Sequence, residues 1–176
     1  NFYNFPEEKI NIVPLAYDKE IYKKIDNPKT NITKNPYFIS VGRLEIRKNQ
    51  ANLIEAFGIF KKTDTKGTKL ILVGKEGYGY EKIIQKANQS EYKNDIKFAG
   101  YQNNQTLAEL YSNSEAFIFP SLYEGFGIPV LEAMASGCPI ILTKHGSFPE
   151  IAGEAGIYFD SNSEEDLRDK IQMLLN

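Results

Sequence analysis

The chain has 176 residues, of which 41% are hydrophobic and 12% aromatic, so it is long and apolar enough for one domain with a core and unlike a disordered chain. Its 21 basic and 23 acidic residues leave a net charge of −2, which gives no electrostatic case for binding nucleic acid. The lone cysteine, Cys138, cannot form an intrachain disulfide, and no apolar stretch is long enough to span a bilayer.

Residues 1–36 are polar and rich in turn signals such as Asn27-Pro28 and Asn35-Pro36. We interpret them as a linker segment from an N-terminal domain that this chain lacks, followed by one domain over residues 37–176. The first residues include neither an initiator Met nor a signal-peptide layout. We therefore expect the chain to be a piece of a longer, cytoplasmic protein.

From residue 37 onward, short apolar runs alternate with amphipathic helical patterns. The predicted strands are Tyr37–Val41, Lys69–Val73, Ile96–Ala99, Ala116–Phe119, Pro139–Leu142 and Gly156–Phe159. The predicted helices cover about residues 49–62, 80–87, 107–111, 129–136 and 163–175. Continuous apolar strands are typical of strands covered on both faces. The pattern therefore predicts an α/β fold: a Rossmann-like parallel sheet of about six strands with helices on both faces.

The stretch from Phe119 to Ile141 concentrates the chemistry of the chain. It predicts a strand, a glycine turn, a short helix with Pro129 at its first position, and another strand. A glycine turn that leads into a helix N-terminus offers N–H groups and a positive dipole end to an anion. Two carboxylates, Glu124 in the turn and Glu132 in the helix, are suited to accept hydrogen bonds from hydroxyls. An anion next to a polyol suggests a nucleotide sugar.

Ligands of such sheets bind at the carboxyl ends of the strands, and Arg43 and Lys48 follow the first strand. They could bind a phosphate, or they could be solvated surface cations. No dinucleotide fingerprint, Walker motif, Asp-x-Asp pair or His/Cys cluster with metal-ligand spacing occurs. We therefore expect a site that needs no metal and no cofactor.

The two acids allow other interpretations. They could be the acid and nucleophile of a glycosidase, a reading that depends on a distance that the sequence does not give. They could also be structural, with Glu132 stabilising its helix and Glu124 filling a turn.

Residues 37–175 resemble the C-terminal, donor-binding half of retaining GT-B glycosyltransferases of family 4, the glycosyl transferases group 1. The most specific match is Pro120-Ser-x-Tyr-Glu124-Gly-Phe-Gly-x-Pro-x-Leu-Glu132-Ala-Met-Ala-x-Gly-x-Pro139. Further matches are Val41-Gly-Arg43-Leu-x-x-x-Lys48-Asn, Phe98-x-Gly-Tyr101, Pro149-Glu150-Ile and Gly153-Glu-Ala-Gly156. The run Ile12-Val-Pro-Leu also looks like the connection between the two halves of such enzymes.

The resemblance implies a role for each matching residue. Arg43 and Lys48 would bind the donor diphosphate, and the turn formed by Gly125, Phe126, Gly127 and Ile128 would contact the phosphates or the sugar through backbone N–H groups. Glu132 would hold the ribose hydroxyls. Glu124 would contact the donor sugar and act as the catalytic residue that stabilises charge as the glycosidic bond breaks. Tyr101 and Gln102 lie where the base usually packs.

The resemblance also implies partners: a UDP-, GDP- or ADP-sugar donor, and a glycan or lipid-linked acceptor held mainly by the missing N-terminal domain. It suggests polysaccharide or O-antigen synthesis, with peripheral membrane contact at the inner face through the missing half. Many relatives carry two glycines before Pro149-Glu150, where this chain has Gly146-Ser147, so that loop's contact with the donor is in question. A nucleotide-sugar 2-epimerase and a non-catalytic nucleotide-sugar-binding module remain alternatives.

Overall fold

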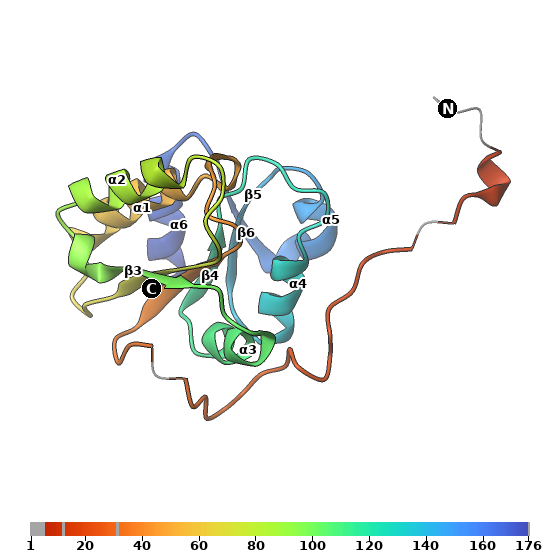
Figure 1. Ribbon diagram of the computed structural model, residues 1–176, viewed down its shortest axis with the longest axis horizontal. Coiled ribbons are helices and arrows are strands. Elements are labelled where there is room, and N and C mark those ends of the chain that lie inside the picture. The colour runs from red at the N-terminus through yellow and green to blue at the C-terminus, as the bar shows by residue number, and fades with distance from the viewer. Residues whose placement is uncertain (1–5, 12, 31, 176) are drawn as a thin grey trace.

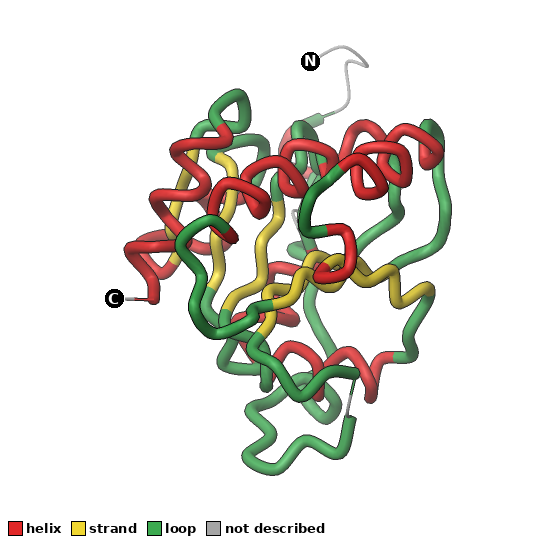
Figure 2. Tube along the Cα trace, turned by 90° about the vertical axis from the view of Figure 1, so that its left-hand side faces the viewer, coloured by secondary structure: helices red, strands yellow, loops and turns green. Residues whose placement is uncertain are grey.

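The computed structural model describes residues 6–11, 13–30 and 32–175. The described part forms one parallel sheet of six strands with helices on both faces (Figures 1 and 2). The strands are β1 (Tyr37–Val41), β2 (Lys69–Val73), β3 (Ile96–Gly100), β4 (Ala116–Phe119), β5 (Ile140–Thr143) and β6 (Gly156–Phe159). Their order in the sheet is β3-β2-β1-β4-β5-β6, and every neighbouring pair is parallel. The predicted Rossmann-like α/β fold is confirmed.

The helices are α1 (Gln50–Lys61), α2 (Tyr80–Gln89), α3 (Asn104–Ser112), α4 (Ile128–Ala135), α5 (Phe148–Ala152) and α6 (Glu164–Leu175). Contacts join α1 with α2 and α6, and α4 with α3 and α5. Single 3-10 turns occur at Glu7–Lys9, Ile46–Lys48, Lys93–Asp95 and Gly153–Ala155. In the described residues no helix has both the length and the apolar character needed to cross a bilayer.

The two faces of the sheet define two hydrophobic clusters, because alternate side chains of a strand point to opposite faces. On β1, Phe38 packs in the cluster with α1, α2 and α6, while Tyr37 and Ile39 pack in the cluster with α3, α4 and α5. Cys138 lies in the second cluster, where burial raises the pKa of its thiol to about 11.

Three local features differ from the sequence predictions or were absent from them. The helix α4 begins at Ile128, so Pro129 occupies its second position and not its first. The helix α5 was not anticipated, because its five residues are too few to show a helical period. At the start of α6, Ser163 Oγ accepts from the Asp166 N–H, but the Asp166 carboxylate accepts from the Asp160 N–H, so the reciprocal capping bond is not made.

The predicted linker segment is not wholly outside the core. Residues 13–20 extend away from the domain (Figure 1), but Tyr22 is only 3% exposed and packs among core residues of α3 and β4. The Lys24 ammonium donates to the carbonyl of Ser112, and the Ile25 N–H donates to the Ser112 hydroxyl. Other parts of this segment, Ile12 among them, lie outside the described residues. The division of the chain at residues 36 and 37 stays a prediction.

Candidate functional site

The strand order reverses between β1 and β4, and the helices that follow these two strands, α1 and α4, pack on opposite faces of the sheet. In open α/β sheets the crevice outside the carboxyl ends of such a strand pair is where ligands bind. The loop after β1 carries Arg43 and Lys48, and the loop after β4 carries Ser121 and Glu124. The order of the strands thus brings two distant segments of the sequence to one place.

Lys48 and Glu124 form an ion pair at this point. Both side chains are largely buried, at 10% and 12% exposure, and the Ser121 hydroxyl donates to the same carboxylate oxygen at 2.7 Å. The Lys48 ammonium also lies over the Phe119 ring, 4.9 Å from its centroid. Two residues that sequence analysis assigned separately, one to the diphosphate and one to the sugar, are therefore neighbours.

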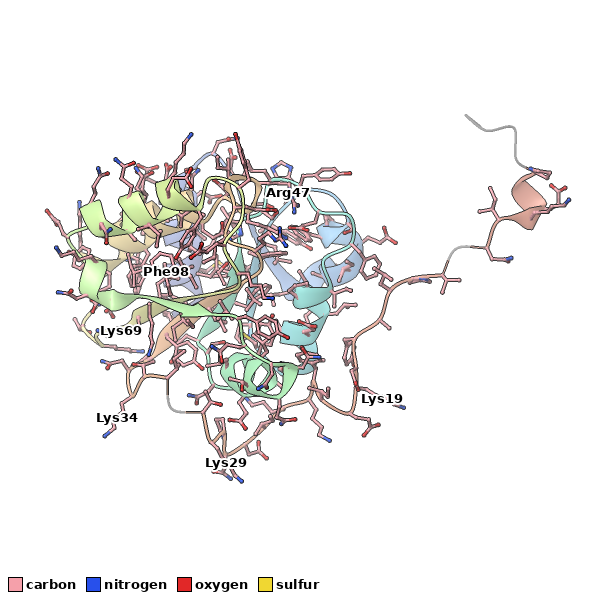
Figure 3. The ribbon with its side chains drawn as sticks, viewed as in Figure 1. Lys19, Lys29, Lys34, Arg47, Lys69 and Phe98 are labelled. Atoms are coloured by element: carbon pink, nitrogen blue, oxygen red, sulfur yellow. The ribbon has the colours of Figure 1, made fainter. Side chains whose placement is uncertain are left out.

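Arg47 belongs to this cluster, although sequence analysis did not select it. Its guanidinium lies 3.5 Å from the Glu124 carboxylate, pairs with Glu45 at 2.8 Å and donates to the carbonyl of Tyr123. Figure 3 labels Arg47 at the upper edge of the domain. The sequence feature that could have identified Arg47 is its position directly before Lys48 in a basic loop. The 3-10 turn Ile46–Lys48 presents both cations to the loop after β4.

Arg43 lies apart from the Lys48–Glu124 pair. It is exposed, and its aliphatic chain lies against Gly77 in the loop after β2, where an added Cβ would come within 2.7 Å of it. Within the described residues no carboxylate forms an ion pair with Arg43. Its guanidinium is thus available to an anion at the same edge of the sheet.

The glycine turn before α4 exposes backbone donors. Gly127 has a φ of 97° and an added Cβ would come within 2.8 Å of the Phe148 ring, so glycine is required there. Gly125 is exposed, and the N–H groups of Phe126, Gly127 and Ile128 donate to no group in the part of the chain that the structure describes. Together with the dipole of α4, these N–H groups can bind an anion.

The loop after β5 supports this turn from behind. The Ser147 hydroxyl donates to the Phe126 carbonyl, and Gly146 lies so close to the Glu124 carbonyl that a Cβ there would come within 2.8 Å. The sequence Gly146-Ser147 therefore holds the turn in position. His145 lies at the side, with its Nε2 3.0 Å from the Ser161 hydroxyl.

Glu132 is half-buried on α4, just over one helical turn after the start of the helix at Ile128. Burial raises the pKa of its carboxyl, and the nearby hydroxyls of Tyr22 and Tyr111 oppose that rise. Glu132 forms no ion pair with any described cation, in contrast to Glu124. The two acids therefore have different environments.

Tyr101 and Gln102 follow β3 at the edge of the sheet. The Gln102 amide donates to the Ala99 carbonyl at 2.6 Å, whereas Tyr101 is 67% exposed, with the Lys75 ammonium 5.2 Å from its ring centroid. A hollow of about 510 Å³ lies beside Tyr101, lined by Leu44, Gly74, Lys75, Glu76, Tyr80, Phe98 and Gly100. A second hollow of about 440 Å³, between α1 and α2, lies on the outer helices, away from the strand ends.

The described residues contain no group of three or more His, Cys, Asp or Glu side chains that could hold a metal ion. The cations Arg43, Arg47 and Lys48 and the N–H groups of the turn are the groups that the site offers to an anion.

Comparison with known proteins agrees with this geometry. Residues 22–176 match the family described as Glycosyl transferases group 1. The chain therefore belongs to this family of glycosyltransferases.

Among curated proteins, the chain is 30% identical over 166 residues to O-antigen chain mannosyltransferase B of Escherichia coli, a match that covers 91% of this chain and 44% of that protein. It is 31% identical over 173 residues to O-antigen chain mannosyltransferase RfbU of Salmonella typhimurium, covering 97% of this chain and 45% of that protein. The chain thus spans less than half the length of these relatives.

Among solved structures, the C-terminal domain of a glycosyl transferase group 1 protein (LpcC) from Francisella tularensis is 27% identical, with a TM-score of 0.77 and coverage of 91% of this chain and 88% of that one. The Anabaena protein HepE, in complex with UDP and glucose, has a TM-score of 0.79 at 21% identity, with coverage of 92% and 46%. These likenesses confirm a domain of the GT-B type.

Proposed function

We propose that this chain is the donor-binding half of a retaining, metal-independent glycosyltransferase that uses a UDP-, GDP- or ADP-sugar in the synthesis of a surface polysaccharide such as O-antigen. The observation that carries the proposal is the Lys48–Glu124 pair at the point where the strand order reverses, directly beside the open N–H groups of the turn before α4. The cation and the N–H groups could bind the diphosphate there, and the carboxylate could bind the sugar.

The diphosphate would lie between Lys48, Arg43 and the turn from Gly125 to Ile128. An ammonium has three donors, so Lys48 can keep its bond to Glu124 and still contact a phosphate oxygen. Negative charge grows on the leaving diphosphate as the glycosidic bond breaks, and fixed donors in a largely buried site stabilise it. These donors supply the charge neutralisation for which other transferases use a metal ion, which is why we propose a metal-independent reaction.

Glu124 and Glu132 would divide the recognition of the donor between them. Glu132, which has no ion pair among the described residues, would accept hydrogen bonds from the ribose hydroxyls. Glu124, with its carboxylate held by Lys48 and Ser121, would face the sugar and act as the catalytic residue. The base would pack beside Tyr101 and Gln102, in or near the hollow after β2 and β3. Retention of configuration rests on the resemblance of the motif to family 4 alone.

The names of the relatives narrow the choice of donor. Two of them are O-antigen chain mannosyltransferases, which supports a nucleoside diphosphate mannose as the first donor to test. The acceptor would be a glycan or lipid-linked glycan held by the N-terminal half, where contact with the cytoplasmic face of the membrane would also arise. This chain alone would bind donor and transfer nothing.

Product analysis of the full-length protein tests the proposal. With donor and acceptor, we expect a glycosylated product whose anomeric configuration matches that of the donor. Release of a 2-epimer without acceptor would instead establish a nucleotide-sugar 2-epimerase. Donor binding with no product would leave a nucleotide-sugar-binding module, and an inverted product would overturn the retaining mechanism.

A further inference from the structure

Two buried tyrosine hydroxyls lie at Glu132 without a hydrogen-bond partner. Tyr22 is 3% exposed and Tyr111 is fully buried, and their rings pack against each other with centroids 6.4 Å apart. Within the described residues, neither hydroxyl oxygen has a partner. Buried polar atoms in native proteins are nearly always satisfied, so a pair of unsatisfied hydroxyls at one place calls for a physical reason.

Among the described residues, Glu132 is the one carboxylate whose charge acts on both tyrosine hydroxyls, so it is the candidate acceptor for both. Burial raises the pKa of both tyrosines, and the Glu132 charge raises each of them further. The hydroxyls act in the opposite direction on Glu132, because they favour its charged form. The three side chains form one group, which we call the ribose triad: Tyr22, Tyr111 and Glu132.

The triad joins two parts of the chain that are far apart in sequence. Tyr111 is on α3 and Glu132 is on α4, two helices in contact, whereas Tyr22 comes from the segment before β1. That segment is fixed on the domain at Ser112, whose hydroxyl accepts from the Ile25 N–H at 3.1 Å and whose carbonyl accepts from Lys24 at 2.9 Å. The position of the Tyr22 hydroxyl therefore depends on how this segment docks.

We propose that Tyr22 and Tyr111 are positioning residues: when a nucleotide binds, their unpaired hydroxyls donate to the Glu132 carboxylate and orient it toward the ribose hydroxyls of the donor. This inference rests on the proposed donor-binding role of Glu132. A carboxylate has acceptor positions for about four hydrogen bonds, so two tyrosine donors leave room for a ribose diol. Because Tyr22 comes from the segment before β1, nucleotide binding and docking of that segment stabilise each other.

A tyrosine elsewhere in the same core provides a matched control. The Tyr37 hydroxyl is buried and donates to the Leu110 carbonyl at 2.8 Å, so Tyr37→Phe removes a satisfied hydrogen bond. Tyr22→Phe removes a hydroxyl that has no partner among the described residues, which should cost no stability before a nucleotide binds. The two substitutions remove the same atom from similar surroundings, and the proposal predicts opposite consequences for them.

The test compares nucleoside diphosphates with their 2′-deoxy counterparts by calorimetric titration of this chain, after UDP, GDP and ADP have identified the tightest binder. We expect wild type to prefer the ribonucleotide, and Tyr22→Phe and Tyr111→Phe to reduce that preference about three- to tenfold. The unfolding midpoint of Tyr22→Phe should be equal to or above that of wild type. Tyr37→Phe should lower the midpoint and leave the preference unchanged.

The possible results separate three claims: the positioning role of the tyrosines, the ribose-binding role of Glu132 and the proposed function. A ribose preference that survives both Tyr22→Phe and Tyr111→Phe would overturn the inference while leaving the proposed function standing. If wild type bound none of the three diphosphates, the proposed function itself would fail. If it bound ribo and deoxy forms equally, the role of Glu132 would fail, and the positioning role with it. Should Tyr22→Phe not fold, Tyr111→Phe carries the same decision.

Discussion

Two clusters of charged side chains lie at opposite ends of the sheet, and they differ in what they leave unsatisfied. At the amino end of β2 and β3, Lys61 pairs with Asp64 at 2.6 Å and with Asp95 at 2.9 Å, and it also donates to the carbonyl of Thr68. The Lys61 and Asp64 side chains are 6% and 2% exposed. All three ammonium donors of Lys61 are thus used within the protein.

At the carboxyl end, Lys48 pairs with one described carboxylate and lies over an aromatic ring, next to a turn whose N–H groups have no acceptor among the residues that the structure describes. Both clusters contain buried lysines paired with acids, so burial and pairing alone do not mark a functional site. The difference is unused hydrogen-bonding capacity at the end of the sheet where ligands bind. We call Lys61, Asp64 and Asp95 the closed cluster, and Lys48, Glu124 and the turn before α4 the open cluster. The closed cluster should contribute to stability, and the open cluster should bind the ligand.

The largest effect is expected at the closed cluster. Lys61→Met leaves Asp95 with Lys69 as its cation, but it leaves the Asp64 carboxylate, 2% exposed, with hydrogen bonds and no cation among the described residues. Breaking a buried ion pair on one side costs about 3–5 kcal/mol. Denaturant unfolding measures this loss. Nucleotide binding of the folded variant should be unchanged, and weakened binding would contradict the division between the clusters.

The next effect is catalytic. In the full-length protein, Glu124→Gln keeps the size of the side chain but removes the charge that we propose faces the sugar, and we expect a loss of roughly 100- to 1,000-fold in the rate of transfer. Binding of the nucleoside diphosphate should be spared. If the substitution weakened diphosphate binding and left the rate of transfer at saturating donor unchanged, the proposed roles of Glu124 and Glu132 would be contradicted.

A smaller effect on stability is expected from Lys48→Met. Glu124 keeps a bond from Ser121 and lies near Arg47, so the loss of Lys48 leaves it with partners, and the free energy of unfolding should fall by about 1 kcal/mol. Denaturant unfolding of Lys48→Met and Lys61→Met under the same conditions compares the two losses in the free energy of unfolding. A loss as large as that of Lys61→Met would mean that both clusters serve stability.

The pH dependence of stability gives the smallest signal. Burial opposes the charged form of Asp64 and Asp95, but hydrogen bonds and the lysine partners outweigh it, so the pKa of each carboxyl is lowered below its usual 3.8. As the pH falls through that range, the unfolded chain binds protons first, and stability declines until the folded pKa values are passed. In Asp64→Asn, unfolding midpoints from about pH 5 to about pH 2.5 should decline less steeply than in wild type. An equal slope would contradict the assignment.

The strands were predictable because their apolar runs are continuous and end at Gly42, Gly74 and Gly100. Once the sheet is parallel, the residues after each strand share one edge, which is why Lys48 and Glu124 could be assigned to the same site. Their direct pairing could not be predicted, since it depends on β1 lying next to β4.

Other features gave no signal in the sequence. Tyr22 sits in a polar segment without a period, and its burial follows from contacts with α3 that are 87 to 89 positions away in the chain. Lys61, Asp64 and Asp95 look like ordinary loop charges until the ends of α1, β2 and β3 are placed together. Long-range contacts of polar residues have no sequence period, so only the structure shows them.

Calorimetric titration of this chain with UDP, GDP and ADP tests the central claim most directly, that the open cluster is a donor diphosphate site. We predict that at least one of the three binds and that Lys48→Met weakens it about tenfold or more. Lys86→Met, which removes the same charge from a pair with Glu55 on the outer helices, should have no effect. Silence with all three diphosphates, or equal weakening by both substitutions, would contradict the claim.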